Sequence, residues 1–171
     1  TLDFVDHEGG PAADFARAAR VGGMLGLGGP RGSRVIEGDI PHWLLIGDET
    51  ALPAIGRKIE ETGPGVVVTS LVAVPGAADE QAFETQAALT PRWIHRPASQ
   101  ATDASAFLKV LESLDIPPRT FVWIAAEAGV AKAVRAYLAG PRAHPPGWLK
   151  SAGYWVRGQA DASVKDLDQA G

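Results

Sequence analysis

The sequence of 171 residues contains no cysteine. This absence excludes a disulfide framework and any thiolate metal site. No apolar run approaches the roughly 20 residues that cross a bilayer, and no signal-peptide pattern is present. The four histidines lie far apart and lack metal-ligand spacing, so no metal site is predicted. Together these absences predict a cytoplasmic protein without stable membrane insertion.

Motifs for several common chemistries are also missing. No serine lies in a nucleophile elbow, which leaves hydrolytic catalysis without support, and no catalytic residue is predicted. Neither G-x-G-x-x-G nor a Walker loop occurs. The paired acids Glu60-Glu61 and Asp79-Glu80 fall on predicted helix faces, where solvation explains them.

The net charge of −4 gives no overall attraction to nucleic acid, and no nucleic-acid partner is predicted. The charge is unevenly spread: residues 1–91 carry 13 acids and 6 bases, whereas residues 92–171 carry 7 acids and 10 bases. The basic C-terminal half suits an anionic ligand, although scattered solvated charges explain it equally well.

One stretch organises the rest of the chain. Residues 43–46 are apolar throughout, which suits a strand buried on both faces of a parallel sheet. The tight turn 47–50 follows directly, and apolar residues then recur at helical spacing over 52–59. Thr50 is the expected N-cap, and Pro53 falls in the first helical turn, where a missing N–H costs little. This is the first half of a βαβ unit, whose helix N-terminus can receive a phosphate.

The chain continues in the same alternating pattern. Strands that alternate with helices predict an α/β fold, a parallel doubly wound sheet of about five strands with helices on both faces. Beyond residue 60, strands are predicted at 66–74, 92–95, 121–125 and 153–156, followed by a polar tail from 160. A helix is predicted at 79–89, with Phe83 on one side. Asp103 is expected to cap a second helix with an inner stripe of Phe107, Leu108, Leu111 and Leu114, and a third helix, marked by Val130, Val134, Tyr137 and Leu138, is expected to end near Gly140.

The first 38 residues differ from the rest. Strands are predicted at 1–6 and 24–27, and a helix at 12–19 with Phe15 facing inward. Residues 28–33 read as a loop and 34–38 as a linker. This segment is too short and glycine-rich to form its own core, so we expect it to be the end of another domain and the chain to be a fragment. The predicted domains are therefore 1–38 and 39–171.

Ligands of such sheets bind beyond the carboxyl ends of the strands. Gly47 would let a ligand approach the backbone, and Thr50 can offer its hydroxyl and amide to a pyrophosphate. Asp48 and Glu49 are expected to face sugar hydroxyls or solvent, because two acids beside a phosphate are unfavourable. A simple capped turn explains the motif about as well. The adjacent aromatics Tyr154 and Trp155 point to opposite faces of a strand, so one can line a site near the basic residues.

Five motifs in order resemble the C-terminal domain of siderophore-interacting proteins, flavin-dependent ferric-siderophore reductases of the ferredoxin–NADP reductase superfamily. The upstream segments 10–12 and 28–33 resemble the end of that family's flavin-binding β-barrel. The matching motifs are Gly47-Asp-Glu-Thr-Ala-Leu-Pro-Ala-Ile, Ala78-Asp-Glu-Gln, Trp93-Ile-His-Arg, Trp123-Ile-Ala-Ala-Glu and Gly153-Tyr-Trp-Val-Arg-Gly.

The resemblance implies that the chain binds NAD(P)H and belongs to a protein that also binds FAD and reduces a ferric siderophore. By this likeness, the residues that contact the cofactors are Gly47, Asp48, Glu49, Thr50, Ala51, Asp79, Ala126, Glu127, Tyr154 and Trp155. Arg157 and Lys150 would attract the anionic ferric siderophore. A reductase with another electron acceptor and a nucleotide-binding module without a redox role remain alternatives.

Three departures from the family pattern affect the expected activity. Ala126 replaces a glycine and adds a methyl beside the nicotinamide, and Ala13 replaces a serine that could contact flavin phosphate. The Arg-x-Tyr-Thr/Ser flavin motif is absent, so this chain is expected to bind flavin poorly. No Arg or Lys occurs over 74–79, which favours NADH over NADPH, although Arg96 or Arg119 could still reach a 2′-phosphate.

Overall fold

The computed structural model describes residues 4, 6, 10–26, 28, 36, 38–159, 162–164 and 167 of the chain. The chain divides into two compact units, residues 1–39 and residues 40–171. Each unit is described by itself.

The second unit is built on a five-stranded parallel sheet with strand order β3-β2-β1-β4-β5. The chain starts in the centre of the sheet, moves outward through β2 to β3, and crosses back to β4 on the other side of β1. This order confirms the predicted parallel α/β fold, with the reversal point between β1 and β4. The strands are β1 (His42–Asp48), β2 (Val67–Val74), β3 (Ala88–His95), β4 (Thr120–Glu127) and β5 (Leu149–Trp155).

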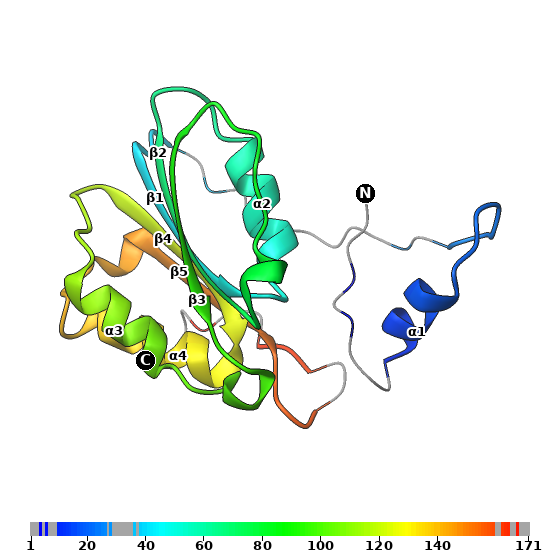
Figure 1. Cartoon of the computed structure of the whole chain (residues 1–171). Coiled ribbons are helices and arrows are strands. Elements are labelled where there is room, and N and C mark those ends of the chain that lie inside the picture. Colours follow the sequence, from blue (N-terminus) through cyan, green and yellow to red (C-terminus); the bar gives the residue numbers. More distant parts are fainter. Residues whose placement is uncertain are drawn as a thin grey trace. The chain divides into compact units, whose positions relative to one another are not determined.

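Helices cover both faces of this sheet (Figure 1). Helix α2 (Leu52–Glu60) packs on β1 and β2 from one side, and α3 (Ser105–Ser113) and α4 (Ala128–Ala139) cover the other. The predicted inner stripes are confirmed, since Phe107, Leu111 and Leu114 and the valines and leucine of α4 are buried, while Leu108 and Tyr137 are partly buried. Three single-turn helices complete the unit: η1 (Ala77–Asp79), η2 (Ala98–Gln100) and η3 (Pro146–Trp148).

The helix starts differ from the predicted caps. Ala51, not Thr50, precedes α2, and no side chain caps that helix, whereas Pro53 lies in its first turn as predicted. Asp103 acts one residue ahead of the α3 cap: its Oδ1 accepts a hydrogen bond from the Ser105 N–H at 2.9 Å. This bond lowers the pKa of the Asp103 carboxyl.

The helix predicted at 79–89 is wrong. Only the single turn η1 forms, residues 80–87 run without helix, and β3 already begins at Ala88. Tertiary contacts outweigh the helical spacing here. The Thr85 hydroxyl donates to the Ile59 carbonyl at 2.7 Å, and the Phe83 ring lies against Gly56, where an added Cβ would come within 2.7 Å of it. This segment therefore covers α2 as an extended chain.

The first unit has one regular element among its described residues, helix α1 (Pro11–Ala18). The predicted helix is thus confirmed to within one residue, but its predicted inward residue is wrong. Phe15 is 38% exposed and contacts the Phe4 ring, while Ala13 is the buried residue. Residues 24–26 form no strand, and most of the strand, loop and linker predicted at 1–6 and 28–38 lies outside the described residues.

The described part of the C-terminal tail joins the sheet. Val164 forms an antiparallel bridge with Gly153, and the Leu167 N–H donates to the Ser151 carbonyl at 3.2 Å. Leu167 is buried in the core beneath α3 and α4. The polar composition of the tail did not indicate this contact, which in the described residues consists of main-chain bonds from Val164 and Leu167 and the buried Leu167 side chain.

Candidate nucleotide site at the carboxyl edge

Three of the predicted segments meet at the carboxyl edge of the sheet. The turn after β1 lies beside the junction of β4 with α4 and beside the end of β5, because β1 pairs with β4 and β4 pairs with β5. The parallel arrangement brings these strand ends together although they are about 80 and 107 residues apart. The predicted residues Gly47 to Ala51, Ala126, Glu127 and Trp155 therefore share one location.

Asp48 connects these segments. Its side chain is buried, and its Oδ2 accepts hydrogen bonds from the Glu127 N–H at 2.8 Å and from the Trp155 Nε1–H at 2.9 Å. Its Oδ1 accepts from the Thr50 N–H at 3.0 Å and from the Thr50 hydroxyl at 2.5 Å. The prediction that Asp48 faces sugar hydroxyls or solvent is wrong, since four internal donors surround its carboxylate and offset its burial.

Glu127 caps the helix that it precedes. Its Oε2 accepts from the N–H groups of Gly129 and Val130 at 2.6 and 3.2 Å, and its side chain is buried. The carboxylate thus occupies the place where an anion would meet the N-terminus of α4. Ala126, also buried, lies one residue earlier at the end of β4.

A β-bulge sets the direction of Trp155. The register between β4 and β5 shifts between Ala126 and Glu127, so Glu127 pairs with Trp155 and Tyr154 is the extra residue. Tyr154 is 39% exposed and packs edge-on against Trp123, and burial of the rest of the side chain raises the pKa of its phenol. The two aromatics thus differ in environment. Trp155 is the one that belongs to the Asp48 cluster, which consists of Asp48, Thr50, Glu127 and Trp155.

Glu49 takes the opposite direction along the edge. Its Oε2 lies 2.9 Å from Nη2 of Arg96, which directly follows β3. The Arg96 side chain is 3% exposed and that of Glu49 is 24% exposed. The ion pair passes over the end of β2, the strand between β1 and β3. Arg96 is not among the predicted cofactor contacts, although it is one of the two arginines that the sequence analysis considered able to reach a 2′-phosphate.

The turn after β1 is held by hydrogen bonds to the main chain and the side chain of Asp48. The Ala51 N–H donates to the Asp48 carbonyl at 3.0 Å, and both donors of Thr50 bind Asp48. A Cβ on Gly47 would lie 2.7 Å from both the Ala125 carbonyl oxygen and Ile55 Cδ1. The glycine therefore permits close packing of β1 against β4 and α2 on that side.

The remaining predicted residues are spread more widely. Arg157 donates from its guanidinium to the carbonyls of Ala98 and Ser99 at 3.0 and 3.2 Å, which fixes η2 beside the edge. Asp79 accepts from the Gly76 N–H at 3.1 Å just after β2. Lys150 pairs with Trp123 near the amino end of β5. Five residues separate it from Trp155, about 16 Å along a strand, so the structure does not bring it to the same place.

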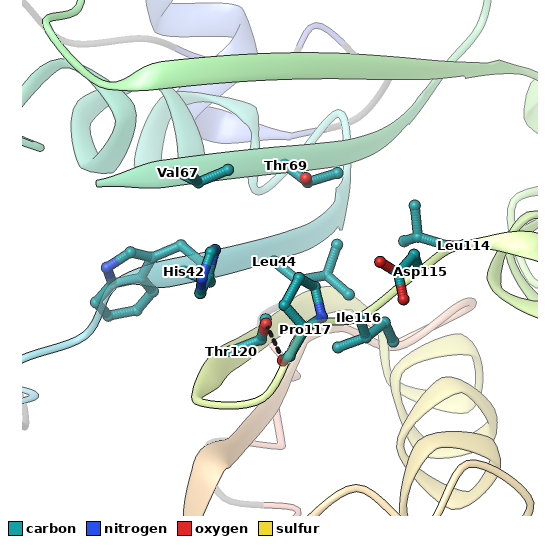
Figure 2. A pocket seen from close by; sticks show the side chains of 10 residues that line it. His42, Leu44, Val67, Thr69, Leu114, Asp115, Ile116, Pro117 and Thr120 are labelled. Carbon is teal, nitrogen blue, oxygen red and sulfur yellow. Dashed lines mark hydrogen bonds between the residues drawn. The ribbon is translucent and has the colours of Figure 1, made fainter. Parts of the chain in front are cut away.

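The opposite edge of the sheet carries a pocket of about 110 Å³. It lies at the amino ends of β1, β2 and β4, against the segment 114–117 that follows α3, and Figure 2 shows Thr120 bonded there to the Pro117 carbonyl. This volume is below the roughly 300 Å³ at which ordinary ligand sites begin. The pocket is thus too small for a dinucleotide and lies away from the Asp48 cluster.

The described residues hold neither a candidate metal cluster nor a helix that could span a membrane. In that part of the chain, no group of three or more histidine, cysteine or acidic side chains is placed to hold a metal ion. No helix there has the length and hydropathy needed to cross a membrane.

The strand order, with its reversal point between β1 and β4, and the helices on both faces define an α/β domain of the doubly wound parallel class. Residues 40–158 match the family model described as siderophore-interacting protein, and residues 1–34 match the siderophore-interacting FAD-binding domain. The chain belongs to the siderophore-interacting protein family, whose named members include ferric-siderophore reductases.

Individual relatives agree with this assignment. The chain is 30% identical over 158 residues to the NADPH-dependent ferric-chelate reductase of Escherichia coli, covering 90% of this chain and 59% of the relative. It is 24% identical to the ferric acinetobactin reductase of Acinetobacter baumannii, covering 97% of this chain and 58% of the relative. A siderophore utilization protein from T. fusca superposes with a TM-score of 0.82 at 35% identity, covering 93% of this chain and 61% of that structure. The chain thus spans about three fifths of the length of these proteins.

Proposed function

We propose that residues 39–171 are the NAD(P)H-binding domain of a flavin-dependent ferric-siderophore reductase, and that residues 1–38 are the end of its flavin-binding domain. The observation that carries the proposal is the Asp48 cluster, which draws the turn after β1, the start of α4 and Trp155 to one place at the carboxyl edge. The matches to the two family models support the same division of the chain.

The pyrophosphate belongs at the N-terminus of α2. Two helices start directly from strand ends at this edge, and Glu127 already caps α4 with its own carboxylate. No side chain caps α2, so its first turn still offers its positive end to an anion. Neither acid of the preceding turn faces this position, because Asp48 is turned inward and Glu49 is directed along the edge to Arg96, which follows β3. The residues present therefore fit a dinucleotide.

The nicotinamide half then lies toward β4 and β5, beside Ala126, Glu127, Tyr154 and Trp155, and the adenosine half lies toward Asp79. When bound, the dinucleotide supplies a hydride to the flavin, from which single electrons reach Fe(III) of the siderophore. The contribution of this chain is to orient the residues around the nicotinamide. The hydrogen bond to Asp48 fixes the Trp155 indole, and the bulge at Tyr154 places Trp155 opposite Glu127.

The proposed iron substrate is an anionic ferric siderophore, whose iron is released as Fe(II) after reduction. Arg157 remains the proposed contact because it is a cation at the edge with its guanidinium exposed, although two of its nitrogens also bind η2. Lys150 is left out of the proposed site because of its place at the far end of β5.

A charge placed in the first turn of α2 tests the pyrophosphate site. Ala54→Asp puts an acid where it favours the helix but repels a pyrophosphate, so NADH and NADPH affinities are expected to fall about tenfold or more while the protein stays folded. Ala54→Asn has nearly the same shape without the charge and is expected to bind within about threefold of the parent. Isothermal titration calorimetry with both dinucleotides measures the difference. Equal affinities in the two variants would argue against a pyrophosphate at α2.

The chain as it stands is expected to bind FAD poorly and to show no turnover alone, because the flavin motif expected from the family is missing from these residues. The visible spectrum of the purified protein checks this directly, and reconstitution with FAD followed by gel filtration is the control. Flavin absorbance at one equivalent per chain would contradict the expectation.

A further inference from the structure

We propose that Glu49, held in place by Arg96, is the residue that discriminates against a 2′-phosphate and makes NADH the preferred dinucleotide. The proposal rests on the proposed function, because it concerns the adenosine end of the same site. It assigns a role to an ion pair that the proposed reduction step does not use.

Burial decides which partner of the ion pair a ligand meets. The Arg96 side chain is 3% exposed, and its Nε and Nη1 are enclosed without a hydrogen-bond partner among the described residues. The Glu49 side chain is 24% exposed, and only its Oε2 is engaged, at 2.9 Å from Arg96 Nη2. A ligand that reaches this part of the edge therefore meets the Glu49 carboxylate and not the guanidinium.

Arg96 also keeps the carboxylate from turning away. Its main chain is anchored, since its N–H donates to the Val74 carbonyl at 3.0 Å and extends the pairing of β3 with β2. Glu49 is the sole acid paired with it in the described part of the chain. Separating the two would leave a buried guanidinium without a counter-charge, which is strongly unfavourable.

The position of the pair matches the adenosine ribose. In the proposed orientation the nicotinamide half lies toward β4 and β5, so the adenosine half extends over β2 toward β3. Glu49 begins at the end of β1 and reaches Arg96 at the end of β3, which places its carboxylate along that path. Asp79, after β2, adds a second acid on the same side.

The chemistry of this position favours a hydroxyl over a phosphate. A carboxylate accepts a hydrogen bond from a ribose 2′-hydroxyl, as acidic residues do in other dinucleotide sites, and it repels a 2′-phosphate. Sites that bind a hydroxyl in this way also discriminate strongly against an analogue that lacks it. The expected order of affinity is NADH first, with NADPH and the adenosine 2′-deoxy analogue of NADH both weaker.

Calorimetry on the whole chain tests the order with three ligands and three proteins. The unmodified chain is expected to bind NADH about tenfold or more tightly than NADPH, and about tenfold or more tightly than the 2′-deoxy analogue. Glu49→Gln keeps a carbonyl oxygen for Arg96 but removes the charge, so the NADH-to-NADPH ratio should narrow to within about threefold. Glu61→Gln is the matched control, because Glu61 is also paired with an arginine, at 2.7 Å, but at the other end of α2. Its ratio should equal that of the unmodified chain.

Arg96→Met separates this proposal from the reverse assignment. If Glu49 discriminates and Arg96 only holds it in place, this variant does not weaken NADPH binding, and the NADH-to-NADPH affinity ratio stays the same or narrows through weaker NADH binding. If Arg96 itself holds a 2′-phosphate, the same variant loses NADPH binding selectively, and the proposal is overturned. Thermal unfolding of each variant verifies that it is folded, and should Glu49→Gln not fold, the 2′-deoxy analogue on the unmodified chain decides.

The outcomes of these titrations distinguish the role of Glu49 from the existence of the dinucleotide site. Equal affinity for NADH and NADPH in the unmodified chain, or tighter NADPH, would overturn the role of Glu49 while leaving the dinucleotide site intact. Failure to bind either dinucleotide would overturn the proposed function, and the role of Glu49 with it.

Discussion

Asp48→Asn is expected to lower the free energy of unfolding by about 3–5 kcal/mol, the range for removing one partner from a buried charged network. The four donors around this side chain are divided between its two oxygens, two on each. An amide has one oxygen and one NH₂ group, so one orientation leaves the Glu127 N–H and the Trp155 Nε1–H facing another donor, and the other leaves the Thr50 N–H facing one while the Thr50 hydroxyl can rotate and accept. Urea unfolding followed by far-UV circular dichroism measures the change.

The fluorescence of Trp155 provides a second readout for this variant. Loss of the indole bond to Asp48 should shift the emission toward that of a solvated tryptophan even in the folded protein. Asp115→Asn is a suitable control, because Asp115 is exposed and has no hydrogen-bond partner among the described residues. It should change stability by less than about 0.5 kcal/mol. A similarly small change in the free energy of unfolding for Asp48→Asn would show that the hydrogen bonds of Asp48 contribute little to the stability of the protein.

Gly47→Ala is the second change with a large expected effect. The added Cβ would lie 2.7 Å from the Ala125 carbonyl oxygen and from Ile55 Cδ1, and 2.9 Å from Ala51 Cβ. The backbone oxygen belongs to the paired strand β4 and cannot move without disturbing the sheet. Such overpacking costs about 1–3 kcal/mol and can cost more, and it should displace the turn that follows. Both stability and dinucleotide affinity are therefore expected to fall.

Gly63→Ala is the matched control for this change. Gly63 follows α2, and an added Cβ there would meet nothing within 4 Å. The substitution should be neutral or slightly stabilising, by up to about 1 kcal/mol, because alanine restricts the unfolded chain. If Gly47→Ala and Gly63→Ala behave alike in urea unfolding, the close contact between β1 and β4 is not a constraint on the site.

The sequence predicted the site region more accurately than the contacts within it. Residues 43–46 and 121–125 are read correctly as parts of strands because their apolar runs are complete in themselves, whereas the strand predicted at 153–156 begins four residues earlier, at Leu149. Parallel strands in a sheet place the residues that follow them at one edge, which predicted that the turn 47–50 lies near Ala126 and Glu127, whereas Trp155 was assigned to the site by the family resemblance. The direction of Asp48 was missed, since two of its four hydrogen-bond donors are 79 and 107 residues away and no local pattern indicates them.

The error at 79–89 has a similar origin. Ala82, Phe83 and Gln86 have helical spacing, but Phe83 packs on Gly56 of α2 and Thr85 binds the Ile59 carbonyl. Those contacts stabilise an extended path that leads directly into β3. Local periodicity could not reveal them, because helix propensity is a weak preference that tertiary contacts readily outweigh.

The sequence by itself thus determined the alternation of strands and helices, the parallel sheet and the edge at which a ligand would bind. These features follow from the periodicity of apolar and polar side chains, which is a local property of the sequence. The tertiary structure alone decided that Asp48 turns inward, that Glu127 caps its own helix and that Glu49 is held by Arg96. Each of these depends on which polar groups meet at the strand ends, because a buried charge takes whichever partner the fold brings within hydrogen-bond distance.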